Sequence, residues 1–117
     1  MTHSPITNVP VEIIVLNWNG LADTLECLES LSHLDYPNYE VVVVDNGSTD
    51  GSAKAIHERF PDVTVIENGK NLGFTGGNNV GLRHALGGNA ACVLLLNNDT
   101  VVDPPFLGQL VEVAQSD

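Results

Sequence analysis

Positive charge is what this 117-residue sequence has least of. Four Lys and Arg stand against 15 Asp and Glu, which gives a formal net charge of -11 at pH 7. A protein that binds nucleic acid or an anionic membrane through electrostatics needs a basic surface, and these few residues do not supply one. We therefore expect no nucleic-acid partner. The same charge would repel a free anionic ligand, so such a ligand would need a bound cation.

Cysteine, long apolar runs and targeting signals are also scarce. Cys27 and Cys92 lie far apart, each in an apolar pattern, which predicts two buried free thiols and a reducing compartment. No Cys or His spacing suits structural zinc. No segment reaches the roughly 18 apolar residues of a membrane span, and the N-terminus lacks a signal-peptide pattern. What is present is a hydrophobic content of 43%, enough for the core of one globular domain.

Strand-like apolar runs alternate with helix-like periodic segments along the chain. The order βαβαβαβα predicts an α/β fold, a mainly parallel, doubly wound sheet in three layers with right-handed crossovers. Residues 1–10 contain two prolines and predict a loose leader before a single domain at 11–117. The predicted strands cover residues 11–16, 40–44, 63–67 and 91–96. The predicted helices open at Asp23, Asp50, Phe74 and Asp103.

Three of these strands run directly into small polar residues. In open parallel sheets, ligands bind just outside the carboxyl ends of the strands. The three polar segments are therefore predicted to share one rim of the sheet. They are Asn17-Trp18-Asn19-Gly20, the stretch from Asp45 to Gly51, and Asn97-Asn98-Asp99.

Each polar candidate has a functional and a structural interpretation. Asp99 offers the hard oxygen that Mg²⁺ or Mn²⁺ needs, with diphosphate oxygens and waters completing the shell, or it is an ordinary strand-end aspartate. Asp45 could accept hydrogen bonds from a ribose or a pyrimidine N–H, or brace its loop. Trp18 could pack beside a base, or be a core or interface aromatic. Asp50 is better explained as a helix cap.

Residues 71–81 form an unusual segment with four glycines and three asparagines. A loop of this composition is costly in chain entropy. Its glycines would let backbone N–H groups approach phosphate oxygens at a helix N-terminus, although a purely structural tight turn is the alternative. The spacing matches neither a P-loop nor a dinucleotide-binding fingerprint.

Taken together, the motifs resemble glycosyltransferase family 2, in particular its bacterial rhamnosyltransferase-like members. The resemblance covers the chain from about Val11 to its end. It implies a GT-A fold, a nucleotide-diphosphate-sugar donor such as a dTDP- or UDP-sugar, and inversion at the anomeric carbon. The segments that carry it are 13–20, 44–52, 71–81 and 95–99.

The resemblance also implies roles for single residues. Asp45 would contact the base or ribose, and Asn78 would lie near the diphosphate. Asn97 stands where the family usually has the first aspartate of an Asp-x-Asp motif. Its amide keeps a hydrogen bond to ribose but gives up charge, so metal affinity is expected to be weaker. The full assignment is nucleotide binding by Asn17, Asn19, Asp45, Gly77, Asn78 and Asn97, and binding of Mg²⁺ or Mn²⁺ by Asp99.

Family members continue well beyond the matched region, with a second half that forms the acceptor site and supplies an aspartate general base. We therefore expect this chain to carry the donor-binding part alone, with no catalytic residue and no transfer activity by itself. The implied acceptor is a saccharide or a lipid-linked saccharide. The implied location is the cytoplasm, with peripheral association at the inner face of the membrane left open. An open sheet edge predicts a homodimer.

Two other functions fit the sequence less fully. A non-catalytic nucleotide-binding or interaction module would keep the fold and lose the chemistry, which the amide at Asn97 favours. A nucleotidyltransferase would need a basic Gly-rich loop after the first strand. Residues 17–21 contain no Lys or Arg, so this third function is the weakest.

Overall fold

The computed structural model describes residues 9–115, and within them strands and helices alternate as predicted. Most boundaries differ from the prediction by only one or two residues, as at Thr64, where the third strand begins. The strands are β1 (Val11–Asn17), β2 (Tyr39–Asp45), β3 (Thr64–Glu67) and β4 (Cys92–Asn97). The helices are α1 (Leu21–Leu31), α2 (Ser52–Arg59), α3 (Gly73–Leu86) and α4 (Phe106–Gln115).

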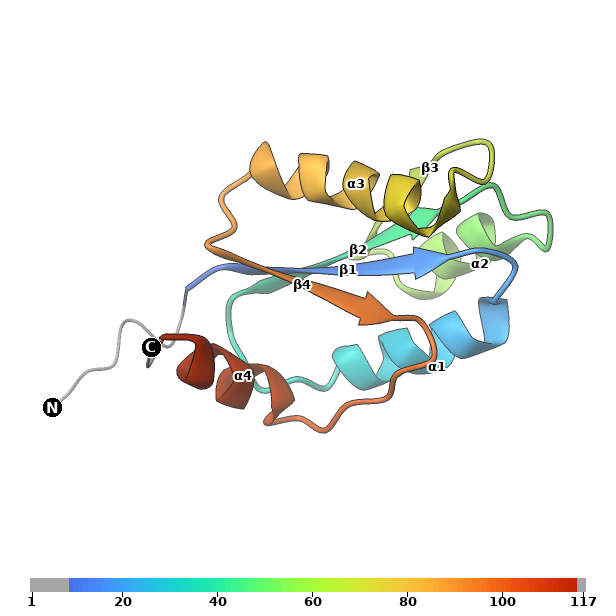
Figure 1. Ribbon diagram of the computed structural model, residues 1–117. Coiled ribbons are helices and arrows are strands. Elements are labelled where there is room, and N and C mark those ends of the chain that lie inside the picture. The colour runs from blue at the N-terminus through green and yellow to red at the C-terminus, as the bar shows by residue number, and fades with distance from the viewer. Residues whose placement is uncertain (1–8, 116–117) are drawn as a thin grey trace, which may run out of the picture.

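The four strands form one parallel sheet in the order β3-β2-β1-β4 (Figure 1). In the register, Asn17 pairs with Asp45, and Leu16 pairs with Asn97. The carboxyl ends of β1, β2 and β4 therefore meet at one edge of the sheet. This confirms the shared polar rim that the sequence predicts.

Helices cover both faces of the sheet, which confirms the three predicted layers. Residues of β1 alternate between the faces, so that Ile13 and Val15 join one core and Ile14 joins the other. Figure 1 shows α3 alone on one side of the sheet, with α1 and α4 on the opposite side. The residues of β2 from Val41 to Val44 are all buried, as their uninterrupted β-branched run predicts. Full burial of such a side chain contributes about 1.5–3 kcal/mol.

The glycine-rich segment is mostly helix, in line with the helix predicted to open at Phe74. Helix α3 begins at Gly73, so the later glycines lie inside it. An added Cβ at Gly77 would lie 2.5 Å from Leu16 Cδ1, and one at Gly81 would lie 2.6 Å from Ile14 Cγ2. Close contact with the sheet therefore explains these two glycines, and it offsets their unfavourable helix propensity of about 1 kcal/mol each.

Two further expectations meet the structure only in part. Cys27 is buried as predicted, whereas Cys92 is half-buried on the edge strand; both are free thiols. Most of the expected leader at 1–10 lies outside the described residues, but the carbonyl of Pro10 accepts hydrogen bonds from the N–H groups of Ala91 and Cys92. Within residues 9–115, no helix combines the length and apolar character needed to cross a bilayer.

Candidate nucleotide-binding site

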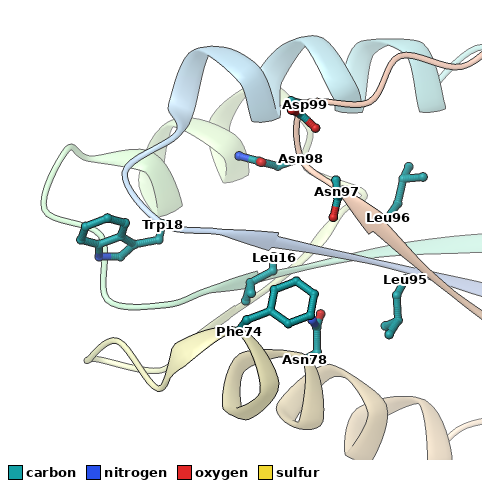
Figure 2. Close-up of a pocket in the computed structure, with 9 residues that line it drawn as sticks. All are labelled: Leu16, Trp18, Phe74, Asn78, Leu95, Leu96, Asn97, Asn98 and Asp99. Carbon is teal, nitrogen blue, oxygen red and sulfur yellow. The ribbon is translucent and has the colours of Figure 1, made fainter.

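A pocket of about 340 Å³ opens at the carboxyl edge of the sheet, between the ends of β1 and β4 and the first turns of α3 (Figure 2). Three of the predicted site residues line it, namely Asn78, Asn97 and Asp99. No Lys or Arg is among the lining residues, so the pocket offers an anionic ligand no cationic side chain. The other lining residues are Leu16, Trp18, Phe74, Leu95, Leu96 and Asn98.

Asn17, the last residue of β1, is the centre of a buried hydrogen-bond network beside this pocket. Its Nδ2 donates to Asp45 Oδ1 at 2.8 Å and to Ser48 Oγ at 3.2 Å. Its Oδ1 accepts from Thr24 Oγ1 at 2.6 Å. Thr24 Oγ1 in turn accepts from Asn98 Nδ2 at 3.1 Å. The chain of donors thus runs from Asn98, just after β4, through Thr24 of α1 to Asn17 of β1, and ends on the carboxylate of β2.

Asp45 is buried and braces the loop that follows it. Its Oδ1 accepts from Ser48 Oγ at 2.7 Å, and its Oδ2 accepts from the Ser48 N–H at 3.1 Å. These contacts match the structural interpretation of Asp45 in the sequence. The carboxylate does not line the pocket but forms the buried end of the network beneath it.

Asn19 and Asp50 hold the loops after β1 and β2 together. Asn19 has a φ of 48°, a left-handed conformation that Asn tolerates better than most residues. Its Oδ1 accepts from the Thr49 N–H at 2.7 Å. Asp50 accepts from the Ser52 N–H at the start of α2 and from the Leu21 N–H at the start of α1. The Ser52 hydroxyl also donates to this carboxylate, and these hydrogen bonds lower the pKa of Asp50.

Two aromatic side chains stand exposed at the mouth of the pocket. Trp18 is 55% exposed and Phe74 is 69% exposed, on two sides of the pocket in Figure 2. The core interpretation of Trp18 is therefore wrong. Trp18 is the first residue after β1 and lies in the turn that leads to α1, outside the sheet. Exposed aromatic faces at a polar rim are suited to packing against a flat or apolar part of a ligand.

Asp99 differs from Asp45 in having no hydrogen-bond or ion-pair partner among residues 9–115. Its charge is felt nonetheless, because burial first and the Asp99 carboxylate second raise the pKa of Cys27 to about 11. No group of three or more His, Cys, Asp or Glu within the described part of the chain could hold a metal by itself. One carboxylate with the neighbouring Asn97 amide suits Mg²⁺ or Mn²⁺ only where ligand oxygens complete the shell. The donor set therefore fits a metal that arrives with a diphosphate.

Gly77 and Asn78 are adjacent in sequence but face different surroundings. Asn78 keeps a small exposed part that lines the pocket. Gly77 lies against Leu16 and Asn46 and is not a lining residue. Four residues of the site have no role in the prediction from sequence: three have partners up to 74 positions away, and the fourth, Phe74, is an exposed aromatic with no local signal. These residues are Thr24, Ser48, Phe74 and Asn98.

A search against models of known families matches residues 12–117 to "Glycosyl transferase family 2". The chain belongs to this family. Its parallel sheet with alternating helices is that of GT-A glycosyltransferases, as the solved structures below show. The predicted fold and family are thereby confirmed.

Curated relatives of the chain are also sugar transferases. The hexosyltransferase Agl10 of low-salt glycan biosynthesis in Haloferax volcanii is 32% identical over 108 residues, which cover 91% of this chain and 33% of the relative. An N-acetylglucosaminyl-diphospho-decaprenol L-rhamnosyltransferase of Mycobacterium tuberculosis is 43% identical over 47 residues, covering 40% of this chain and 15% of the relative.

The mannosyltransferase PcManGT of Pyrobaculum calidifontis, solved with GDP-Man and Mn²⁺, has a TM-score of 0.79 at 29% identity, covering 93% of this chain and 34% of that one. S. aureus TarS 1-349 in complex with UDP-GlcNAc has a TM-score of 0.79 at 26% identity, covering 92% and 32%. The chain thus spans about a third of the length of Agl10 and of these two solved chains.

Proposed function

We propose that this chain is the donor-binding part of an inverting family 2 hexosyltransferase and binds a nucleotide-diphosphate sugar together with Mg²⁺ or Mn²⁺. The observation that carries the proposal is Asp99. Its carboxylate lacks a hydrogen-bond or ion-pair partner among residues 9–115 and lies in a pocket without a basic side chain. A diphosphate would be repelled there unless a cation lay between the two, and Mg²⁺ is usually held by one or two carboxylates plus substrate phosphates.

Different residues of the polar rim are assigned to different parts of the donor. Asp45, Asn17 and Asn19 shape the end that takes the base and ribose, and Trp18 packs beside the base. Asn97 donates or accepts a hydrogen bond at the ribose. Asn78, with Gly77 behind it, lies near the diphosphate at the start of α3. Asp99 would hold the metal, which neutralises phosphate charge when bound.

For the sugar and the acceptor, the proposal draws support from the relatives. We place a dTDP- or UDP-sugar in the pocket, including dTDP-rhamnose, because a matching relative is a rhamnosyltransferase. The acceptor is a saccharide or lipid-linked saccharide, bound by a part of the enzyme outside the matched region. Such a reaction belongs in the cytoplasm or at the inner face of the membrane. The general base for the acceptor hydroxyl would lie in that same part of the enzyme, so we expect no transfer by the isolated chain.

Calorimetry tests donor binding directly. UDP and dTDP are titrated into the chain with Mn²⁺, with Mg²⁺ and with EDTA. Asp99→Asn is the test variant, and Asp103→Asn is the control, since it removes the same charge from an exposed position outside the pocket. We expect binding with metal by the wild type and the control, weakened at least about tenfold by EDTA or by Asp99→Asn. Absence of binding by the wild type under every condition would instead favour the non-catalytic interaction module.

We also propose that the isolated chain forms a homodimer through β4. This strand is an edge of the sheet, its six residues carry no charge, and Val93 and Leu95 expose apolar surface. Such an edge readily pairs with another strand. Sedimentation should detect a dimer that Val93→Lys dissociates and that Leu86→Lys, on exposed α3 surface, leaves intact. Monomer alone at all concentrations would contradict the dimer.

A further inference from the structure

The side chain of Asn46, the residue after β2, uses its whole hydrogen-bonding capacity on one loop. Its Nδ2 donates to Asn71 Oδ1 and to the Gly73 carbonyl, each at 3.0 Å. Its Oδ1 accepts from Asn68 Nδ2 at 3.0 Å and from the Leu72 N–H at 2.9 Å. A side-chain amide has two donor hydrogens and two acceptor lone pairs, so every one is satisfied. We call these four bonds the Asn46 clamp.

The clamp holds the loop that delivers α3 to the pocket. Asn46 is 2% exposed, and its own N–H donates to the Asn17 carbonyl at 2.8 Å, which fixes it to the end of β1. The loop rests on the adjacent turn with no space between them. At Gly47, where φ is 82°, an added Cβ would lie 2.6 Å from the backbone carbon of Lys70. Asn46 therefore connects the rigid strand ends to the loop by direct contact.

The first turns of α3 depend on this connection. Two of the clamp bonds reach the residues at which the helix begins, Leu72 and Gly73. Leu72, the N-cap residue, makes no side-chain cap. The Gly73 N–H donates to Asn71 Oδ1 at 2.8 Å, and that oxygen also accepts a clamp bond from Asn46. One turn further, a Cβ on Gly77 would lie 3.1 Å from Asn46 Nδ2. Phe74 and Asn78, which line the pocket, are carried by these same turns.

We propose that Asn46 is a positioning residue of the donor site, which sets where α3 presents Asn78 to the diphosphate and Phe74 to the pocket. The inference rests on the proposed function, since it assigns the diphosphate to the start of α3. Asn46 itself does not line the pocket. Its effect passes through the loop from Asn68 to Gly73. The end of the site that takes the base and ribose depends instead on the Asn17 network. The Asn46 side chain makes no hydrogen bond to that network.

The test compares UDP with UMP in the presence of Mn²⁺. Asn46→Asp keeps the shape of the side chain but replaces the two N–H donors with an oxygen facing two acceptors. We expect the preference for UDP over UMP to fall at least fivefold, while UMP affinity stays within twofold. Asn68→Ala removes one clamp bond and disturbs the fold less than Asn46→Asp does. It should therefore lower the preference for UDP by a smaller factor. Asn79→Asp, an exposed change of the same charge on α3, should leave it unchanged.

The outcomes separate this inference from the function on which it rests. An unchanged preference for UDP in folded Asn46→Asp or, if that variant does not fold, in Asn68→Ala would overturn the positioning role alone. An equal loss of UDP and UMP affinity would also overturn it, because it would mean a general structural role. A wild-type chain that binds neither nucleotide would overturn the proposed function and this inference with it.

Discussion

The two ends of the polar rim are built in opposite ways. At the β2 end, Asn17, Asp45 and Asn46 are buried and their side chains are engaged by residues of the same chain. At the β4 end, Asn97 and Asp99 are exposed, and neither side chain has a hydrogen-bond partner among residues 9–115. Folding thus satisfies the polar side chains at the β2 end, whereas at the β4 end polar side chains remain available to a ligand.

This difference follows from the position of each strand. β1 and β2 are central, so polar groups at their ends are covered by loops and must find partners, because an unpaired buried polar group costs about 1–3 kcal/mol. β4 is an edge strand, and solvent satisfies its terminal side chains. The β4 end is therefore free to exchange water for phosphate or metal without breaking any bond of the fold.

The largest difference in stability should appear when the last residue of β1 and the last residue of β4 are each replaced by alanine. Asn17→Ala removes the partner of Asp45, Ser48 and Thr24 and leaves a buried carboxylate short of a donor. We expect it to lower the free energy of unfolding by about 3 kcal/mol. Asn97→Ala, at the matching end of β4, should change it by no more than about 0.5 kcal/mol. Urea unfolding measures both, and similar values would remove the distinction between the two ends.

A smaller loss of stability should follow from adding a methyl group where α3 packs against the sheet. Gly77→Ala places a methyl group 2.5 Å from Leu16 Cδ1, so the helix or that side chain must shift. Overpacking of this kind costs about 1–3 kcal/mol. Gly88→Ala is the control, since its nearest neighbour would be the Ala85 carbonyl oxygen at 3.7 Å. Thermal unfolding of the two variants should differ accordingly, and equal stability would mean that α3 is not tightly packed here.

The sequence predicts the framework better than the site. The uninterrupted valines in β2 and the alternation of strands and helices are enough to predict the layers and the parallel sheet, because local apolar patterns indicate which residues are buried. The polar rim also follows, since strand ends of a parallel sheet share an edge. Asp99 is correctly placed in a pocket for the same reason.

What the sequence does not reveal is which polar residues are used up inside the fold. Asp45 and Asp99 look alike as strand-end carboxylates, yet only Asp45 is buried with internal donors. The partners that decide this lie 28 residues away for Asn17 and Asp45, and 74 away for Thr24 and Asn98. The exposure of Trp18 likewise does not follow from its residue type, since tryptophan can belong to a core or to a surface. Such choices are made by tertiary contacts.

The smallest of these effects concerns pH at the β2 end. Hydrogen bonds from Ser52 lower the pKa of Asp50 below its usual 3.8. The stability that Asp50 contributes is therefore present above about pH 4 and is lost as pH falls through its folded-state pKa. Melting temperatures of the wild type and Asp50→Asn should differ slightly at pH 5–7 and converge below pH 4. A difference that persists unchanged into acid would show that the Asp50 charge plays no part.

The most direct measurement is the amide spectrum of ¹⁵N-labelled chain with Mn²⁺, recorded with and without UDP or dTDP. A bound Mn²⁺ ion broadens the signals of nearby amides and so reports its own position. We predict that, only with nucleotide present, Mn²⁺ broadens Asn97, Asn98 and Asp99 strongly and the amides of β3 little, and that Asp99→Asn abolishes the effect. Broadening centred elsewhere, or none with either nucleotide, would contradict a metal-dependent donor site at the β4 end.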